Sequence, residues 1–196
     1  MVIPPITPDP VLFFCEAYCY LSDHGYVEEI RWAETLSPLE QQTPETFFAE
    51  YVWVVLNAGM KEQVARKIYD RFMTARDPAV IRHRGRRAAV EQALAHADEW
   101  FAALLEAEDK LAYLESLPWI GQITKYHLAR NLGIDVVKPD RHLVRLAARF
   151  GYATPDALCR AIQVEMGAPP GPAVRLGTID LVLWRYCNLL GGEGRS

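Results

Sequence analysis

The feature that most constrains this chain is a polar capping residue followed directly by proline, which recurs along its 196 residues. The pairs are Thr7-Pro8, Ser37-Pro38, Thr43-Pro44, Asp77-Pro78 and Thr154-Pro155. In each pair the polar side chain can accept a hydrogen bond from the first turn of a helix. Proline then occupies the first helical position, where its missing N–H has no partner to lose. Five such starts predict a chain built from successive helices.

The pattern of apolar residues points the same way. Val, Ile and Thr do not gather into the alternating runs that indicate strands. Apolar residues recur at helical spacing instead, and the stripe in the predicted helix 87–106 is formed by Val90, Leu94, Ala97, Phe101 and Leu104. Ser37 and Glu40 also fit a capping box at one helix start. We therefore predict an all-α fold of nine or ten helices.

Composition bounds the class of protein. Hydrophobic residues make up 51% of the chain, enough for a core and unlike a disordered segment. No apolar run approaches the ~20 residues of a membrane span, and the first residues lack the pattern of a secretion signal. Four cysteines do not indicate a disulfide framework. We expect a cytoplasmic protein without a membrane partner. A net charge of −4 counts against nonspecific nucleic-acid binding, yet it leaves room for a local basic face.

A tight hairpin at residues 117–121, with the sequence Leu-Pro-Trp-Ile-Gly, separates two predicted helices. Pro118 bars continuation of the first helix. Gly121 permits a positive φ or a close backbone approach. We expect the second helix to run from Gln122 to Asn131, so that unpaired backbone N–H groups at its start face the hairpin. Such a helix terminus attracts anions, phosphate among them.

Two motifs together carry a resemblance to a known family. The stretch L-P-W-I-G-Q-I-T, followed about seventeen residues later by K-P-D-R-H-L-V-R-L, resembles the helix-hairpin-helix DNA glycosylase superfamily. That family has L-P-G-V-G-x-x-T-A and then Gly-Pro-Asp. A fainter likeness covers residues 47–72, where A-E-Y-V-W-V-V-L-N-A-G-M is similar to the family's early helix and its DNA-probing loop. Trp119 stands in place of the first hairpin glycine, and Lys138 in place of the glycine before Pro-Asp.

The resemblance implies a two-lobed architecture. We expect one helical lobe from residues 1–43 with 138–196. Residues 44–137 would form the other lobe and carry the helix-hairpin-helix motif. A cleft between the lobes would then receive the nucleic acid.

Asp140 is the catalytic candidate that the resemblance implies. An aspartate at a helix start is by itself most often a cap. In a glycosylase, an ionised carboxylate stabilises the oxocarbenium character of the sugar as the base departs, and it can orient or deprotonate water. The target nucleotide must first leave the duplex stack. On this hypothesis the chain excises a damaged or modified base by hydrolysing its N-glycosidic bond.

A lyase step is the alternative within the same enzyme class. Bifunctional members carry a lysine that attacks the sugar to form a Schiff base, at the position of Ile123 here. Isoleucine cannot do this. Lys125 lies two residues on, about 200° around a helix. We therefore expect a monofunctional enzyme, with a bifunctional one acting through Lys125 as the alternative.

The resemblance also implies contacts to DNA. Hairpin and cleft residues expected at the DNA are Trp119, Gly121, Gln122, Ile123, Lys125, Lys138 and His142. The loop 57–60, with Asn57 and Met60, would probe the stack, and Trp53 and Tyr126 are candidates for the base pocket. Backbone carbonyls of Glu115, Leu117 and Ile120 could hold Na⁺ or K⁺. The basic run 82–87 is interpreted as a solvated loop, with a phosphate contact as the alternative.

Cofactors and partners complete the expectation. Cys159 and Cys187 are isolated in sequence, so we predict no iron–sulfur cluster and no required cofactor. The expected partner is double-stranded DNA, bound by a monomer. Two alternatives stay open: a non-catalytic DNA-binding protein that keeps the hairpin, and an all-α protein unrelated to DNA. The sequence does not identify the base.

Overall fold

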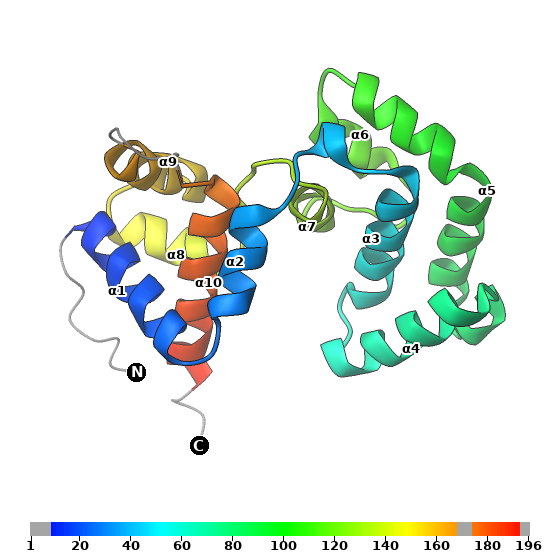
Figure 1. The fold of residues 1–196 in the computed structure, drawn as a ribbon, viewed down its shortest axis with the longest axis horizontal. Coiled ribbons are helices and arrows are strands. Elements are labelled where there is room, and N and C mark those ends of the chain that lie inside the picture. Colours follow the sequence, from blue (N-terminus) through cyan, green and yellow to red (C-terminus); the bar gives the residue numbers. More distant parts are fainter. Residues whose placement is uncertain (1–8, 168–173, 193–196) are drawn as a thin grey trace. The chain divides into compact units, whose positions relative to one another are not determined.

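The computed structural model describes residues 9–167 and 174–192, and these residues form helices and no strands, which confirms the all-α prediction. The α-helices of the described residues are α1 (Pro10–Asp23), α2 (Val27–Thr35), α3 (Pro44–Asn57), α4 (Glu62–Ala75), α5 (Arg84–Glu106), α6 (Lys110–Ser116), α7 (Thr124–Asn131), α8 (Arg141–Arg149), α9 (Pro155–Met166) and α10 (Leu176–Gly192) (Figure 1). None of these helices combines the length and apolar character needed to cross a membrane.

Three of the predicted capping pairs start helical segments as expected. Thr43 caps α3 and Thr154 caps α9, each accepting a backbone N–H three residues on at 3.1 Å. Asp77 caps a short 3₁₀ turn, Pro78–Val80, through a bond of 2.8 Å. The pair Thr7-Pro8 lies outside the described residues. Asp9 instead caps α1 and is itself followed by proline, so the same local chemistry operates two residues later.

The prediction for Ser37 is wrong. The segment after it is only a 3₁₀ turn, Leu39–Gln41, whose capping position is occupied by Pro38 without a side-chain hydrogen bond. The Ser37 carbonyl accepts a bond of 2.7 Å from the side chain of Gln42. The same carbonyl lies so close to Gly133 that a Cβ there would clash with it. These contacts of Ser37 are therefore made by its backbone carbonyl, and its hydroxyl does not cap the turn.

The contacts divide the chain into two compact units, residues 1–36 with 135–196 and residues 37–134. In the first unit α10 is central, because it packs against α1, α2, α8 and α9. Its core buries Phe13 and Phe14 from α1 and Ile179, Val182 and Leu183 from α10. Each such side chain contributes roughly 1.5–3 kcal/mol of burial free energy.

In the second unit α3 is the central helix, and it packs against α4, α5 and α7. Its buried residues are Phe47, Phe48, Tyr51, Val52, Val54, Val55 and Leu56. Burial nearly all round explains why this helix shows little separation of polar and apolar faces. The α3 helix ends at Asn57, and Gly59 follows with φ +67°, a left-handed conformation that commonly ends a helix.

Candidate functional site

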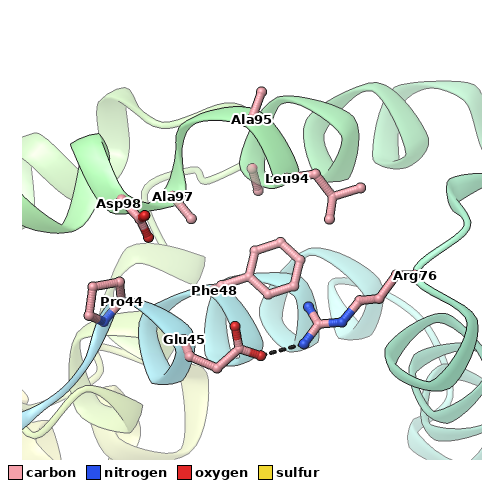
Figure 2. A pocket seen from close by; sticks show the side chains of 9 residues that line it. Pro44, Glu45, Phe48, Arg76, Leu94, Ala95, Ala97 and Asp98 are labelled. Carbon is pink, nitrogen blue, oxygen red and sulfur yellow. Dashed lines mark hydrogen bonds and ion pairs between the residues drawn. The ribbon is translucent and has the colours of Figure 1, made fainter.

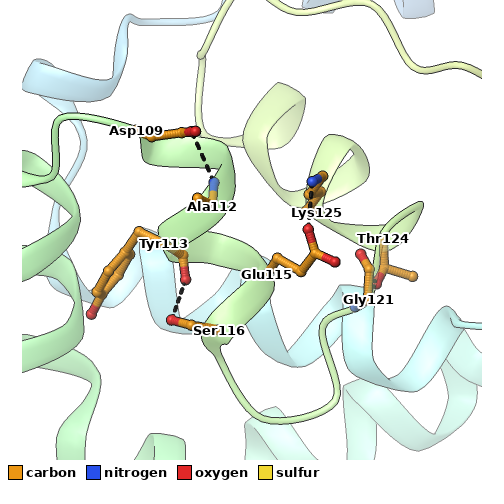
Figure 3. Close-up of polar contacts among 8 residues, drawn as sticks. All are labelled: Asp109, Ala112, Tyr113, Glu115, Ser116, Gly121, Thr124 and Lys125. Atoms are coloured by element: carbon orange, nitrogen blue, oxygen red, sulfur yellow. Dashed lines mark hydrogen bonds and ion pairs between the residues drawn. The ribbon is translucent and has the colours of Figure 1, made fainter.

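The hairpin turns at a different residue from the one predicted. Trp119, not Gly121, has the left-handed backbone, with φ +65°. Helix α7 also begins at Thr124 rather than Gln122. The Gly121 N–H donates to Thr124 Oγ1 at 2.8 Å, and its carbonyl accepts from the Lys125 N–H at 3.0 Å (Figure 3). These two bonds close a turn over residues 121–124 before the regular helix starts.

This turn decides which backbone donors face solvent. The Gly121 N–H, expected to bind phosphate, is engaged by the Thr124 hydroxyl. The N–H groups of Gln122 and Ile123 donate to no other described residue, and both residues are exposed. A Cβ on Gly121 would meet nothing within 4 Å, so the tip of the turn is open. The donors available to an anion are therefore those of Gln122 and Ile123.

The Trp119 ring lies on the first turn of α5. A Cβ at Gly85 would overlap Cζ3 of the ring and lie 3.0 Å from Cη2, so the indole rests directly on the glycine. The His83 ring meets it edge-on, with centroids 5.0 Å apart, and the Arg86 guanidinium lies 5.9 Å from its centroid. The side chain nevertheless remains 42% exposed. The adjoining Pro118 carbonyl accepts a bond of 2.5 Å from the Tyr51 hydroxyl on α3.

The basic run is not a loop, contrary to the preferred interpretation of the sequence. Residues 84–87 form the first turn of α5, and the His83 Nδ1 caps it by accepting the Arg86 N–H at 3.4 Å. Arg86 Nη2 donates to the carbonyl of Ala58, and Arg87 Nε donates to the carbonyl of Ile81 at 2.8 Å. Two of the arginines thus tie down backbone carbonyls. Arg82 and Arg84 stay exposed.

These contacts bring together three segments that are distant in sequence: the loop 57–60, the basic turn 83–87 and the hairpin 117–124. Arg86 joins the first two, and Trp119 joins the last two. In the loop, Met60 N–H donates to the Asn57 carbonyl at 3.1 Å, and both residues are half-buried. Beside the loop, an open hollow of about 650 Å³ is lined by Lys61, Glu62, Gln63 and Arg66.

The base-pocket candidates occupy different surroundings. Trp53 is half-buried, with the Arg66 guanidinium 3.9 Å above its ring and Tyr69 at its edge. Tyr126 is half-buried on α7, and the Lys125 ammonium lies 5.5 Å from its ring. Within the described residues the two aromatic rings are not in contact with each other. Of the two candidates, Trp53 contacts Arg66, which is one of the residues that line the hollow.

One turn before Trp53, Glu50 lies on the same helix. Its carboxylate accepts a bond of 2.7 Å from the side chain of Asn131, which is buried. Burial raises the pKa of Glu50, against the opposing effects of the Asn131 hydrogen bond and the charge of Arg66. This bond connects α3 to α7, the second helix of the hairpin.

Lys125 is held by an ion pair. Its Nζ lies 2.5 Å from Glu115 Oε2 on the preceding helix (Figure 3). This hydrogen bond raises the pKa of Lys125, which favours the ammonium. An ammonium has no lone pair for attack on a sugar carbon. The ion pair with Glu115 therefore lowers the fraction of neutral amine that the lyase alternative requires.

Asp140 lies in the first unit, where it caps α8. Its Oδ1 accepts the backbone N–H groups of His142 at 2.8 Å and Leu143 at 3.0 Å. Its Oδ2 accepts no hydrogen bond from the described residues, and the residue is half-buried rather than sealed in the core. The negative charge at a helix N-terminus is favoured by roughly 0.3–1 kcal/mol. Of the neighbouring candidates, Lys138 and His142 are half-buried.

The connector that leads to Asp140 is fixed to α10. The Asp135 carboxylate accepts the N–H groups of Leu176 at 3.2 Å and Gly177 at 2.9 Å, so it caps that helix. The Lys138 N–H donates to the buried carboxylate of Asp180 at 3.2 Å. With Pro139 restricting the backbone between them, these bonds set the position of Asp140.

The expected cation ligands are backbone carbonyls of the hairpin. The Leu117 carbonyl accepts the Ile120 N–H at 3.1 Å. Across residues 9–167 and 174–192, no three His, Cys, Asp or Glu side chains gather as metal ligands would. Cys159 is buried, and burial raises the pKa of Cys187 to about 11, so both thiols are protonated at neutral pH.

A second hollow, of about 150 Å³, lies between α3 and α5 and contains none of the predicted site residues. In Figure 2 the Glu45 carboxylate pairs with Arg76, whose guanidinium lies 4.8 Å from the Phe48 ring. These contacts tie α3 to the end of α4. We assign this hollow no role.

No family model, curated protein or solved structure matches this chain. The functional argument therefore depends on its own residues. Sequence reasoning missed the positioning roles of Tyr51, Gly85 and Asp135. It interpreted Arg86 as part of a solvated loop, whereas Arg86 bonds to the Ala58 carbonyl. A lone glycine inside the basic run was the one available hint, because glycine in a helix start suggests close packing.

Proposed function

We propose that this protein is a monofunctional DNA glycosylase of the helix-hairpin-helix type, which excises a damaged or modified base from double-stranded DNA. One observation carries the proposal: the loop 57–60, the basic turn and the hairpin lie together in one unit. The sequence resemblance assigned the loop and the hairpin to DNA, and the arginines add positive charge beside them.

The hairpin would hold a phosphate through the N–H groups of Gln122 and Ile123. Backbone donors at a helix start suit a phosphate oxygen because they carry partial positive charge and are already oriented. The open tip at Gly121 lets a strand approach without a steric barrier. Within the first unit, Lys138 and His142 would contact phosphate. Within the second unit, the loop at Asn57 and Met60 would enter the stack.

The chemistry would belong to Asp140. Two backbone N–H groups fix its Oδ1 and leave Oδ2 for the reaction. An ionised carboxylate beside C1′ of the everted nucleotide stabilises the positive charge that develops as the base leaves, and it orients the attacking water.

The test is Asp140→Asn. Asparagine caps a helix about as well as aspartate, so the fold should persist while base release falls by at least about 100-fold. Oligonucleotides with oxidised, alkylated, deaminated, mismatched or hypermodified bases are incubated with the protein, and mass spectrometry reads the free base. Asp9→Asn, at the cap of α1 in the same unit, is the matched control and should keep turnover. Unchanged base release by Asp140→Asn would remove Asp140 from the mechanism.

The lyase alternative has its own test through Lys125. Because Glu115 keeps this lysine protonated, borohydride should trap no covalent DNA adduct. Lys125→Ala should then leave base release within about twofold of the parent protein. An adduct that forms in the parent protein and disappears in Lys125→Ala would make the enzyme bifunctional.

A second candidate is a DNA-binding protein without catalysis. The observation that favours it is that the capping bonds of Asp140 already account for an aspartate at this position. Salt-dependent binding of duplex DNA with no base release across the full panel would support this candidate. Base release from any member of the panel would exclude it.

A further inference from the structure

We propose that Trp119 is a stacking platform for one unpaired nucleobase, with the exposed Arg82 and Arg84 of the basic run holding the adjoining phosphates. The inference rests on the nucleic-acid-binding part of the proposed function and is independent of Asp140. It concerns a residue at which this chain departs from the sequence pattern that it resembles. The ligand class is an extrahelical or single-stranded nucleotide.

The backbone at Trp119 is the first observation. A non-glycine residue with φ +65° is strained relative to glycine, and a bulky one is seldom found there. Strain of this kind persists where the surrounding contacts impose it, and it gathers at binding sites. Here the Tyr51 hydroxyl donates to the carbonyl of the preceding residue, Pro118, and this bond helps to hold the turn in place. Glycine would make the same turn without strain, so the indole itself calls for an explanation.

The packing of Gly85 and His83 against the Trp119 ring is the second observation. Gly85 lies where any Cβ would overlap the indole, so the absence of a side chain there makes room for the ring. His83 fixes one edge. The ring is thereby immobilised at the surface while 42% of the side chain remains exposed. A preoriented aromatic surface binds with less loss of conformational entropy than a mobile one.

The charge around the ring identifies the occupant. Arg86 lies beside the indole, and the exposed Arg82 and Arg84 belong to the same basic run. A fixed aromatic ring with flanking cations is the combination that binds single-stranded nucleic acid, because bases stack on the ring and phosphates pair with the cations. The unpaired N–H groups of Gln122 and Ile123, three and four residues on, add a second phosphate contact to the same turn. An apolar protein segment would gain nothing from the arginines.

The experiment measures binding of the full chain in the Asp140→Asn form, so that no substrate is consumed. Three fluorescent duplexes are compared at one salt concentration: a fully paired duplex, one with a single bulged thymidine, and one with a bulged abasic residue. Anisotropy gives a dissociation constant for each. The bulged thymidine should bind about tenfold more tightly than the bulged abasic residue, since stacking of one base contributes that much or more.

Two substitutions act on the platform in different ways. Trp119→Gly removes the ring but suits the left-handed turn, so it should fold and bind both bulged duplexes equally. Gly85→Ala keeps the ring but displaces it, and it should lose part of the preference. Combined with Trp119→Gly, the Gly85→Ala change should have no further effect on the preference. Trp32→Ala, which removes a similarly exposed tryptophan of the first unit, is the control and should keep the full preference.

The outcomes separate this inference from the proposed function. Suppose that the Asp140→Asn protein binds all three duplexes but does not prefer the bulged thymidine to the bulged abasic residue. Trp119 is then not a platform, and the glycosylase proposal stands. The same conclusion follows if Trp119→Gly keeps the preference. If the parent protein binds none of the duplexes, both proposals fail.

Discussion

The two units of this protein are each built on one apolar helix, α10 in the first and α3 in the second, but they hold their candidate segments by opposite chemistry. In the first unit, carboxylates of Asp135 and Asp180 accept backbone N–H groups of α10 and of the connector. In the second unit, side-chain donors satisfy backbone carbonyls: Tyr51 bonds to Pro118, and Arg86 bonds to Ala58.

This difference determines what each segment offers to a ligand. In the first unit, the N–H groups beside Asp140 are consumed, so the segment presents a carboxylate oxygen. In the second unit, the side chains of Tyr51 and Arg86 donate to backbone carbonyls. The N–H groups of Gln122 and Ile123 remain available at the surface. The first unit is therefore suited to stabilise a positive charge, and the second unit is suited to bind an anion. The proposed reaction needs both functions.

The largest expected effect on stability comes from a comparison of alanine substitutions at two glycines, one in each unit. Gly133 has φ +82° and faces the Ser37 carbonyl, whereas Gly151 has φ +80° and open space around it. Gly133→Ala should lower the free energy of unfolding by more than about 2 kcal/mol, because a steric clash adds to the backbone strain. Gly151→Ala should cost only the strain, about 1 kcal/mol. Urea unfolding measures both, and equal losses would show that the chain relaxes around residue 133.

Tyr51→Phe tests the way the second unit holds its hairpin. Loss of the bond to the Pro118 carbonyl should destabilise that unit by about 1 kcal/mol and speed hydrogen exchange in residues 117–124. Burial raises the pKa of Tyr51, so the hydroxyl stays a donor at neutral pH and the effect should not depend on pH between 6 and about 9. Tyr69→Phe, on α4, serves as the comparison. Unchanged exchange in the hairpin would mean that α3 does not hold it through this bond.

The smallest expected effect concerns Glu50, the one carboxylate shown above to link α3 to α7. Burial raises the pKa of Glu50 in the folded protein above the 4.5 of the unfolded chain. As the pH rises, the unfolded chain therefore loses this proton before the folded protein does. The free energy of unfolding falls from about pH 4.5 until the pH passes the raised pKa. Glu50→Gln keeps an acceptor for Asn131 and removes the charge. It should match the parent protein near pH 4 and exceed it at pH 7 by no more than about 1 kcal/mol in thermal unfolding. A loss of stability at pH 7 would show instead that the charge interaction with Arg66 dominates.

The helix starts at Thr43 and Thr154 could be predicted from the sequence because a capping bond joins residues three apart. The cap at Asp140 followed from the same local rule. Ser37 broke the rule, since its surroundings are set by Gly133, almost a hundred residues away in sequence. The basic run was misjudged for a related reason: its arginines bond to carbonyls of other segments, which makes a helical first turn stable there.

The sequence by itself determined an all-α chain, the capped helix starts at Thr43 and Thr154, and a proline turn followed by an aspartate cap. These depend on backbone preferences and on bonds within a few residues. Only the tertiary structure decided that Trp119 adopts the left-handed turn, that Gly85 lies under its ring, and that the loop 57–60 belongs to the same surface. The reason is physical: each of these features is stabilised by contacts between segments whose separation in sequence carries no information about their distance in space.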